Sequence, residues 1–224
     1  MPALRGIVIV TGTDTGVGKT IATAAIAAAA KAAGQRVAML KPAQTGDDDD
    51  AGTVRRLAEP DIALTLVHYP DPLAPATAAR VSGRKPLELP EVVAAARSLS
   101  EHHDVVLVEG AGGLLVPMGP QWTIAHLAQE LGAPAIVVIR PALGTLNHTA
   151  LTLEALRHRG IVAHLVLGTW PATPELVHRT NLEDFPAELH GWLPENAANE
   201  PKFKGEAPRW LSPLLYGVSI ELPW

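Results

Sequence analysis

A lysine and a threonine stand directly behind a run of glycines near the start of the chain. Residues 11–20 read TGTDTGVGKT, after the apolar run IVIV at 7–10 and before an alanine-rich stretch at 21–33. A strand, a glycine-containing turn, Gly-Lys-Thr and a helix are the context of a phosphate-binding loop, whose backbone N–H groups surround phosphate oxygens. In such a loop Lys19 would reach the outer phosphates of a nucleotide, and the Thr20 hydroxyl would bind Mg²⁺.

The spacing of this loop departs from the standard pattern. Four residues normally separate its two glycines, which would place the first glycine at position 13, but the chain has Thr13 there and Gly12 one residue earlier. The loop therefore reads G-x5-G-K-T. An ordinary glycine-rich turn is the alternative, and the lysine and threonine in register at the helix start favour the phosphate loop.

Three further polar groups follow apolar runs. KPAQTG at 41–46 follows VAML at 37–40, DDDD at 47–50 comes directly after it, and Glu109 ends the run DVVLVE. Ligands of open α/β sheets bind beyond the carboxyl ends of the strands, so these groups are expected to meet the phosphate loop there. Each has a plainer alternative: Lys41 as a lysine at a strand end, the aspartates as a solvated loop, and Glu109 as a cap of the next turn. Together they could hold a magnesium–nucleotide complex.

The elements that must position these groups alternate along the chain. Continuous apolar runs predict buried strands at 7–10, 37–40, 104–109, 135–139, 161–167 and 189–193. Helical stretches are expected at 21–33, 53–57, 91–100, 123–131, 145–159 and 175–184. This alternation predicts an α/β fold with a doubly wound, mostly parallel sheet and helices on both faces, as in P-loop NTPases.

Length and composition set limits on the whole molecule. The 224 residues suit a single domain over 1–224, in which the proline-rich segment 201–224 is less certain and could wrap on the surface or pack through its tryptophans. The proline-rich segment 69–90 is expected to be an extended loop near the site. A net charge of −5 argues against a nucleic-acid partner, no stretch is long and apolar enough to span a membrane, and no signal peptide precedes the first strand. A cytoplasmic protein is expected.

Four motifs together resemble the dethiobiotin synthetase family. They are GTDTGVGKT at 12–20, KPAQTG at 41–46, VEGAGG at 108–113 and LGTLNH at 143–148, and the resemblance extends to about residue 199. The loop with five intervening residues is this family's own form. The resemblance implies an ATP-dependent ligase that takes 7,8-diaminopelargonate, CO2 (or bicarbonate) and ATP or another nucleoside triphosphate, with Mg²⁺, and closes the cyclic urea of dethiobiotin. It also implies a homodimer with the active site at the interface.

Roles for individual residues follow from the same resemblance. It makes Lys41 and Lys19 catalytic and gives the metal to Thr20, Asp50 and Glu109, with Asp47 as the alternative aspartate. The nucleotide would contact Thr15, Gly16, Val17, Gly18, Lys19, Thr20, Glu109, Gly110, Gly112, Thr169, Trp170, Leu193, Pro194 and Glu195. The substrate would contact Thr15, Lys41, Thr45, Gly112, Leu143, Gly144, Thr145, Leu146 and Asn147. The last five open a helix, whose free N–H groups suit the substrate's distal carboxylate; an ordinary helix cap is the alternative. Lys41→Ala is expected to abolish turnover and largely keep the fold.

The chain departs from the family pattern at two places. Many members carry an Asn-Asp pair after the late strand, whose asparagine reads adenine, whereas this chain has GTWP at 168–171. Gly16 stands where some members have glutamate. The first departure leaves the preferred base open, so another nucleotide could serve.

Two other classes of P-loop protein share this kind of loop. A switch ATPase of the partitioning type, acting through protein partners, usually carries an extra lysine early in the loop, but this chain has Gly12, Thr13 and Asp14 there. A cobyrinate amidase normally adds a glutaminase domain with a nucleophilic cysteine, and this chain has no cysteine. Both alternatives therefore fit less well than the ligase.

Overall fold

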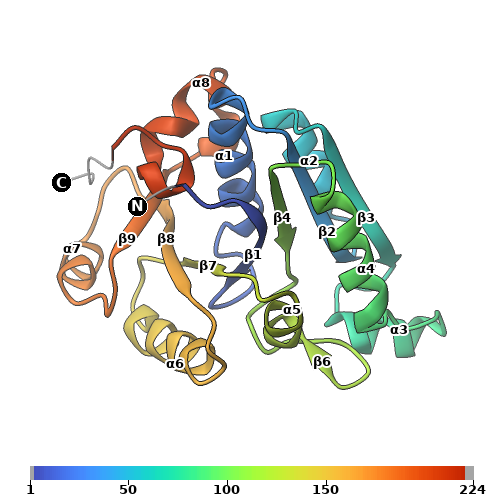
Figure 1. Ribbon diagram of the computed structural model, residues 1–224. Coiled ribbons are helices and arrows are strands. Elements are labelled where there is room, and N and C mark those ends of the chain that lie inside the picture. Colours follow the sequence, from blue (N-terminus) through green and yellow to red (C-terminus); the bar gives the residue numbers. More distant parts are fainter. Residues whose placement is uncertain (1–2, 220–224) are drawn as a thin grey trace.

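A seven-stranded parallel sheet forms the centre of the protein. The computed structural model describes residues 3–219, and the strand order is β3-β2-β4-β1-β7-β8-β9 (Figure 1). All neighbouring strands of this sheet are parallel. The strands are β1 (Gly6–Gly12), β2 (Val37–Thr45), β3 (Ile62–Tyr69), β4 (Val105–Glu109), β7 (Ala135–Ile139), β8 (Ala163–Trp170) and β9 (Leu189–Pro194). This confirms the predicted doubly wound α/β fold.

Helices cover both faces of the sheet, as Figure 1 shows. The helices are α1 (Lys19–Ala32), α2 (Asp50–Ala58), α3 (Pro75–Ser82), α4 (Leu89–Ser100), α5 (Ile124–Leu131), α6 (Thr145–Arg157), α7 (Leu176–Glu183) and α8 (Phe203–Glu206). One core cluster joins the sheet to α1, α2 and α8, and the other joins it to α3, α4, α5 and α6. Alternate residues of β1 pack into the two clusters: Val8 and Val10 belong to the first, and Ile9 belongs to the second. A strand covered on both faces needs apolar residues at every position, which explains its unbroken apolar run.

The second strand is longer than predicted. The apolar run at 37–40 was expected to end as a strand at Lys41-Pro42, which was wrong, because β2 continues to Thr45. Strand β4 pairs with β2 only as far as Leu40, whereas β3 pairs with β2 up to Thr45. Pro42, which lacks an N–H group, falls in the part of β2 that has lost one neighbour, where a missing donor is tolerated. Lys41 therefore sits inside a strand.

Several further elements were not anticipated. Strand β3 borders the sheet and has partly exposed residues, so it lacks the continuous apolar signal that marks the central strands. The segment 69–90, expected as an extended loop, contains α3 and the start of α4. Proline stands in the first turn of both helices, where its missing N–H has no partner in any helix, so these prolines begin helices and do not interrupt them. A small antiparallel hairpin, β5 (Pro117–Gly119) and β6 (Trp122–Thr123), precedes α5.

The segment after residue 201 packs on the core as far as the structure describes it. Two 3₁₀ turns, Ala207–Trp210 and Pro213–Leu215, follow α8, and Phe203, Trp210 and Leu214 are buried in the α1-side cluster. Leu4 N–H donates to Leu214 O (3.0 Å), which brings the two ends of the chain together. Trp224 lies outside the described residues. Among residues 3–219, no helix combines the length and apolar character needed to cross a bilayer.

Candidate active site

The phosphate loop connects β1 to α1 at the carboxyl edge of the sheet. Gly16 and Gly18 have positive φ angles (72° and 96°), which glycine adopts without strain. Gly18 is the N-cap of α1 and offers no side chain to its N-terminal turn. The unpaired N–H groups at this helix start are therefore available to an anion, as a phosphate site requires.

Lys19 is held within this loop. Its Nζ donates to Asp14 O (2.9 Å), and the residue is 7% exposed. Burial lowers the pKa of Lys19 to about 8; the Glu109 carboxylate opposes this shift and the Lys41 ammonium adds to it. A buried cation beside open N–H groups makes this pocket ready for polyanionic phosphates.

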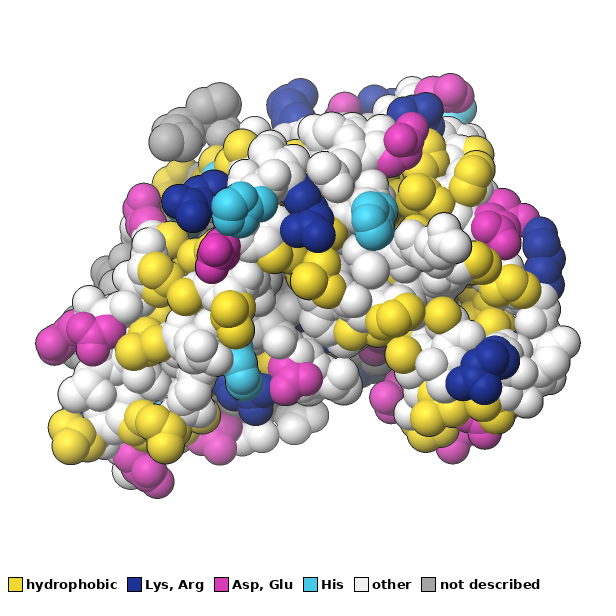
Figure 2. Space-filling view, turned by 90° about the horizontal axis from the view of Figure 1, so that it is seen from below, with side chains coloured by type: hydrophobic (Ala, Val, Ile, Leu, Met, Phe, Trp, Pro, Cys, Tyr) yellow, Lys and Arg dark blue, Asp and Glu magenta, His cyan; other side chains and the backbone are white. Residues whose placement is uncertain are grey.

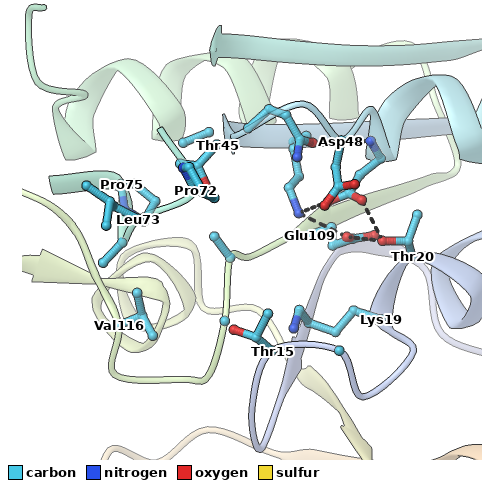
Figure 3. Close-up of a pocket in the computed structure, with 18 of the residues that line it drawn as sticks. Thr15, Lys19, Thr20, Thr45, Asp48, Pro72, Leu73, Pro75, Glu109 and Val116 are labelled. Carbon is cyan, nitrogen blue, oxygen red and sulfur yellow. Dashed lines mark hydrogen bonds and ion pairs between the residues drawn. The ribbon is translucent and has the colours of Figure 1, made fainter. Parts of the chain in front are cut away.

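Two carboxylates meet the Thr20 hydroxyl in front of the loop (Figure 3). The Thr20 hydroxyl lies 2.9 Å from Glu109 Oε1 and 3.0 Å from Asp50 Oδ1, so its one proton is donated to either of these two acceptors. Glu109, at the end of β4, is fully buried, and its Oε2 accepts from the Thr23 hydroxyl (2.6 Å). Asp50 opens α2, where Asp49 caps the helix by accepting from Gly52 N–H (2.8 Å). Oxygen donors of this kind are the ligands that Mg²⁺ prefers.

Lys41 joins the two carboxylates. Its Nζ donates to Glu109 Oε1 (3.0 Å) and Gly110 O (3.1 Å), and it forms an ion pair with Asp50. Burial alone would lower the pKa of Lys41, but the Glu109 and Asp50 carboxylates outweigh burial and raise it. The same ion pair outweighs desolvation at Asp50 and lowers the pKa of that carboxyl. Lys41 and Asp50 are therefore both charged at neutral pH.

The lysines and carboxylates line one cavity of about 550 Å³. Residues of the phosphate loop, β2, the start of α2 and the segment after β4 form its polar wall, and Thr15, Thr45 and Gly112 lie beside the lysines. Its far wall is made by Pro72, Leu73, Ala74, Pro75 and Val116 (Figure 3). β4 lies between β1 and β2 in the sheet; Lys41 lies within β2, and Lys19 is the first residue of α1, which follows β1 through the phosphate loop. A cavity with a polar end and an apolar end suits a ligand that has both polar groups and a hydrocarbon part.

The predicted base-side residues lie on another side of the phosphate loop and do not line this cavity. A Cβ on Gly18 would come within 3.9 Å of Thr169 N and 3.7 Å of a Leu193 methyl group, so the ends of β8 and β9 border the loop. Trp170 is only 4% exposed and meets the His178 ring edge to face. Glu195 Oε2 accepts from Ala172 N–H (2.7 Å). Val17, which was predicted to contact the nucleotide, is buried in the core cluster on the α1 side of the sheet.

The predicted substrate-binding turn at the start of α6 also lies outside the cavity of its own chain. Gly144 is the N-cap of α6 (φ 90°), and no side chain caps this helix start. Leu143 is 86% exposed, whereas Thr145 is buried. An ion pair between Arg140 and Asp14 ties the segment before this turn to the phosphate loop.

Several site residues were not anticipated from the sequence. Thr23 stands one turn beyond Thr20 on α1, so its contact with Glu109 could have been inferred from helical spacing. Gln44 Oε1 accepts from Asp50 N–H (3.2 Å) and fixes the start of α2. Asp48, a member of the DDDD run, and residues 72–75 of the segment expected near the site do line the cavity, but the sequence assigned no individual role to them.

Charged side chains are mixed on the carboxyl-edge face of the molecule. Figure 2 shows Lys and Arg scattered among acidic and hydrophobic side chains, with the centre of the face hollowed. Among residues 3–219, no three His, Cys, Asp or Glu side chains are grouped to hold a metal by themselves. Any metal at Thr20, Asp50 and Glu109 would therefore need ligands from outside the chain, such as phosphate oxygens and water.

Comparison of the sequence with known proteins gives close relatives. An AAA domain model matches residues 7–201. An ATP-dependent dethiobiotin synthetase of Saccharopolyspora erythraea is 51% identical over 221 residues, which cover 94% of this chain and 97% of that protein. The enzymes of the same name from Streptomyces avermitilis and Streptomyces coelicolor are 50% and 48% identical, each over 95% of this chain and 94% of the relative.

Solved structures share the fold at much lower identity. The septum site-determining protein MinD from Pyrococcus horikoshii, complexed with Mg-ADP, has a TM-score of 0.59 and 19% identity, over 95% of this chain and 93% of that one. A putative plasmid partition protein from Borrelia burgdorferi, bound to AMPPNP, has a TM-score of 0.59 and 11% identity, over 92% and 95% of the two chains. These similarities show the fold alone, so they do not favour the switch-ATPase alternative.

The sequence relatives decide between the classes that share this fold. Identity near 50% extends over nearly the whole chain and over nearly the whole length of each relative. The chain belongs to the family of ATP-dependent dethiobiotin synthetases, the ATP-using cyclo-ligases of biotin biosynthesis.

Proposed function

We propose that this ligase joins CO2 to one amine of 7,8-diaminopelargonate and then uses ATP to close the ring of dethiobiotin, with release of ADP and phosphate. The observation that carries the proposal is the meeting of Lys19, Lys41, Asp50 and Glu109 in one cavity beside a phosphate loop. A reaction that passes through two anions, a carbamate and a phosphoryl group in transfer, needs this density of cationic donors.

The first step is formation of the carbamate. An amine must be neutral to attack CO2, and nearby ammonium groups disfavour a further positive charge, so Lys19 and Lys41 lower the pKa of the substrate amine. The pKa of Lys19, already lowered to about 8 by burial and in part by Lys41, reflects the same penalty. The amine nitrogen bonds to the carbon of CO2 and loses its proton to solvent. The resulting carbamate anion lies beside the two lysines.

The second stage is phosphoryl transfer and ring closure. A carbamate oxygen attacks the γ-phosphorus of ATP, ADP leaves, and a carbamic–phosphoric anhydride forms. The neutral second amine attacks the carbonyl carbon, the C–O bond to phosphate breaks so that inorganic phosphate leaves, the attacking nitrogen gives up a proton to phosphate or solvent, and the cyclic urea results. Lys19 and Lys41 stabilise charge on the transferring phosphoryl oxygens and on the departing phosphate.

The hydroxyl of Thr20 and the carboxylates of Asp50 and Glu109 would hold Mg²⁺. Their oxygens lie about one hydrogen bond apart and face the phosphate loop, so the donor set fits a hard cation that also takes phosphate oxygens. Bound there, Mg²⁺ supplies charge neutralisation and alignment of the β- and γ-phosphates. Asp50 suits this role better than Asp47, which is exposed and outside the cluster.

The remaining residues would bind the two ends of the ligands. Thr15, Thr45 and Gly112 lie in the cavity where the reacting nitrogens would sit. The nucleotide base would lie near Thr169, Trp170, Leu193, Pro194 and Glu195. In a homodimer, the open N-terminus of α6, from Leu143 to Asn147, would receive the substrate's distal carboxylate from the other protomer's site. We place this reaction in the cytoplasm because ATP and Mg²⁺ are supplied there.

The test is release of ADP and dethiobiotin by the purified protein with Mg²⁺, ATP and bicarbonate, with and without 7,8-diaminopelargonate. We expect strict dependence on the diamine and loss of turnover when EDTA removes the metal. ATP hydrolysis at the same rate with and without the diamine would contradict the proposal and favour a switch ATPase. Sedimentation velocity measures the expected dimer independently.

A further inference from the structure

The segment that leads from β7 into α6 has little internal support. Within residues 140–144, Ala142 O accepts from Thr145 N–H (3.1 Å), Leu143 is 86% exposed, and Gly144 has a φ of 90°. No side chain caps α6. The direction in which the first N–H groups of α6 point therefore depends on the buried Thr145 and Thr149 of the helix and on the contacts that hold the segment before it.

A buried amide of α7 holds it. Asn181 Nδ2 donates to Pro141 O (2.8 Å) and to Ala142 O (3.2 Å). Among residues Leu176–Glu183 of α7, Asn181 alone is buried (7% exposed), whereas Leu176 is 71% exposed. A helix that buries an amide in place of an apolar side chain gains directional hydrogen bonds at that position. These two bonds fix the carbonyl groups immediately before the α6 turn.

A second, weaker anchor is the side chain of Arg140, at the start of the segment. Arg140 donates to the Asp14 carboxylate of the phosphate loop, but the two side chains are 38% and 53% exposed, so the pair contributes little free energy. The other end of α7 reaches the base side of the site, where His178 meets Trp170 with ring centroids 6.1 Å apart. Helix α7 thus connects the end of β8 to the entry of α6.

We infer that Asn181 is a positioning residue for recognition of the substrate's carboxylate. By holding the carbonyls of Pro141 and Ala142, it sets the orientation of the first turn of α6, which receives that carboxylate. The inference rests on the proposed function, because it acts through the same turn. It adds a residue that touches neither nucleotide nor substrate and that lies on a helix outside the motifs of the chain.

The test compares 7,8-diaminopelargonate with its methyl ester, which has the same two amines and no negative charge. We expect wild-type protein to prefer the acid, and we expect Asn181→Leu to lower the ratio of kcat/KM for acid over ester about tenfold, since two hydrogen bonds to the segment are lost. Asn181→Asp, which keeps the size and loses the donor, should act in the same direction. The KM for ATP should stay within about twofold, because the phosphate loop is unchanged.

Thr180→Val is the matched control, because the Thr180 hydroxyl donates only to carbonyls of its own helix; its acid-to-ester ratio should equal that of wild type. If Asn181→Leu does not fold, Asn181→Asp gives the same comparison. An equal loss on acid and ester would show a merely structural role and overturn the inference. Equal use of acid and ester by wild type, with diamine-dependent ATP turnover intact, would also overturn it. Absence of that turnover in wild type would instead overturn the proposed function.

Discussion

The most consequential side chain of the site is Lys41, which has two roles at once. Its ammonium is the counter-ion of Glu109, a fully buried carboxylate, and of Asp50. Its own side chain is 4% exposed. The expectation that Lys41→Ala would largely keep the fold assumed a lysine at a strand end, whereas Lys41 lies inside β2. Removal of one partner of a buried ion pair leaves an uncompensated charge, which is strongly destabilising.

We therefore expect Lys41→Met to lower turnover about 1,000-fold, because the carbamate and the transferring phosphoryl group both lose a cationic hydrogen-bond donor. The same substitution should lower the free energy of unfolding by about 3 kcal/mol. The double variant Lys41→Met, Glu109→Gln should recover most of the stability and none of the activity, since the buried charge is gone. Urea unfolding and the ADP-release assay measure the two effects.

Lys31→Met is the matched control, because Lys31 pairs with Asp61 in solvent, with side chains 33% and 38% exposed. It should change stability by less than about 1 kcal/mol. Equal stability of Lys41→Met and wild type would show that the Lys41 ion pairs do not hold the fold.

At the scale of elements, the phosphate loop is shaped by β8 as well as by its own glycines. A Cβ at Gly168 would lie 2.1 Å from Val17 O and 2.9 Å from Ile139 O. Only a residue without a Cβ allows the end of β8 to approach the loop so closely. Gly168, near the end of β8, therefore shapes the phosphate loop through its close backbone contact with Val17.

Gly168→Ala should displace Val17 and raise the KM for ATP, by about 100-fold if the loop moves by an ångström. The secondary structure measured by circular dichroism should persist, because the clash is confined to one turn. Gly205→Ala is the control, since a Cβ there meets nothing within 4 Å. An unchanged KM for ATP in Gly168→Ala would mean that the loop tolerates the displacement.

At the scale of the whole molecule, the strands β8 and β9 carry a pair of histidines that responds to pH. The rings of His164 and His190 meet edge to face with centroids 5.0 Å apart. Burial lowers the pKa of both, with His190 adding to the shift of His164 and Glu188 opposing that of His190. Ser212 N–H donates to His190 O (2.8 Å), so this pair also adjoins the segment after residue 201.

Because burial lowers the pKa of both histidines in the folded protein, the unfolded chain binds protons at these rings at a higher pH than the folded protein does. The stability contributed by the neutral pair is therefore present above the unfolded pKa, near 6.5, and is lost as the pH falls below it. We expect the melting temperature to fall between pH 8 and pH 5, and to fall about 2 °C less in His164→Asn, which cannot titrate.

The control for this measurement is His102→Asn, because the substitution of this exposed side chain leaves the His164–His190 pair intact. An identical fall of melting temperature in His164→Asn and wild type would exclude the histidine pair as its cause.

Much of the molecule could be predicted from the sequence because the signals are local. Unbroken apolar runs marked the central strands, which are covered on both faces, and the order of Gly, Lys and Thr placed the phosphate loop at the start of α1. Elements with weaker local signals escaped prediction. The border strand β3 is partly exposed, and the prolines of 75–90 begin helices where an extended loop was expected.

The tertiary structure decided how closely distant residues meet, including those that the family resemblance had already grouped around a metal. Thr20, Asp50 and Glu109 come from three separate elements, and the sheet order that inserts β4 between β1 and β2 brings them within hydrogen-bonding distance. The same holds for Asn181, whose amide reaches a segment some 40 positions earlier. Sequence patterns report burial and local conformation, because these depend on neighbours along the chain. Contacts between elements depend on how whole strands and helices pack, and no local pattern records that.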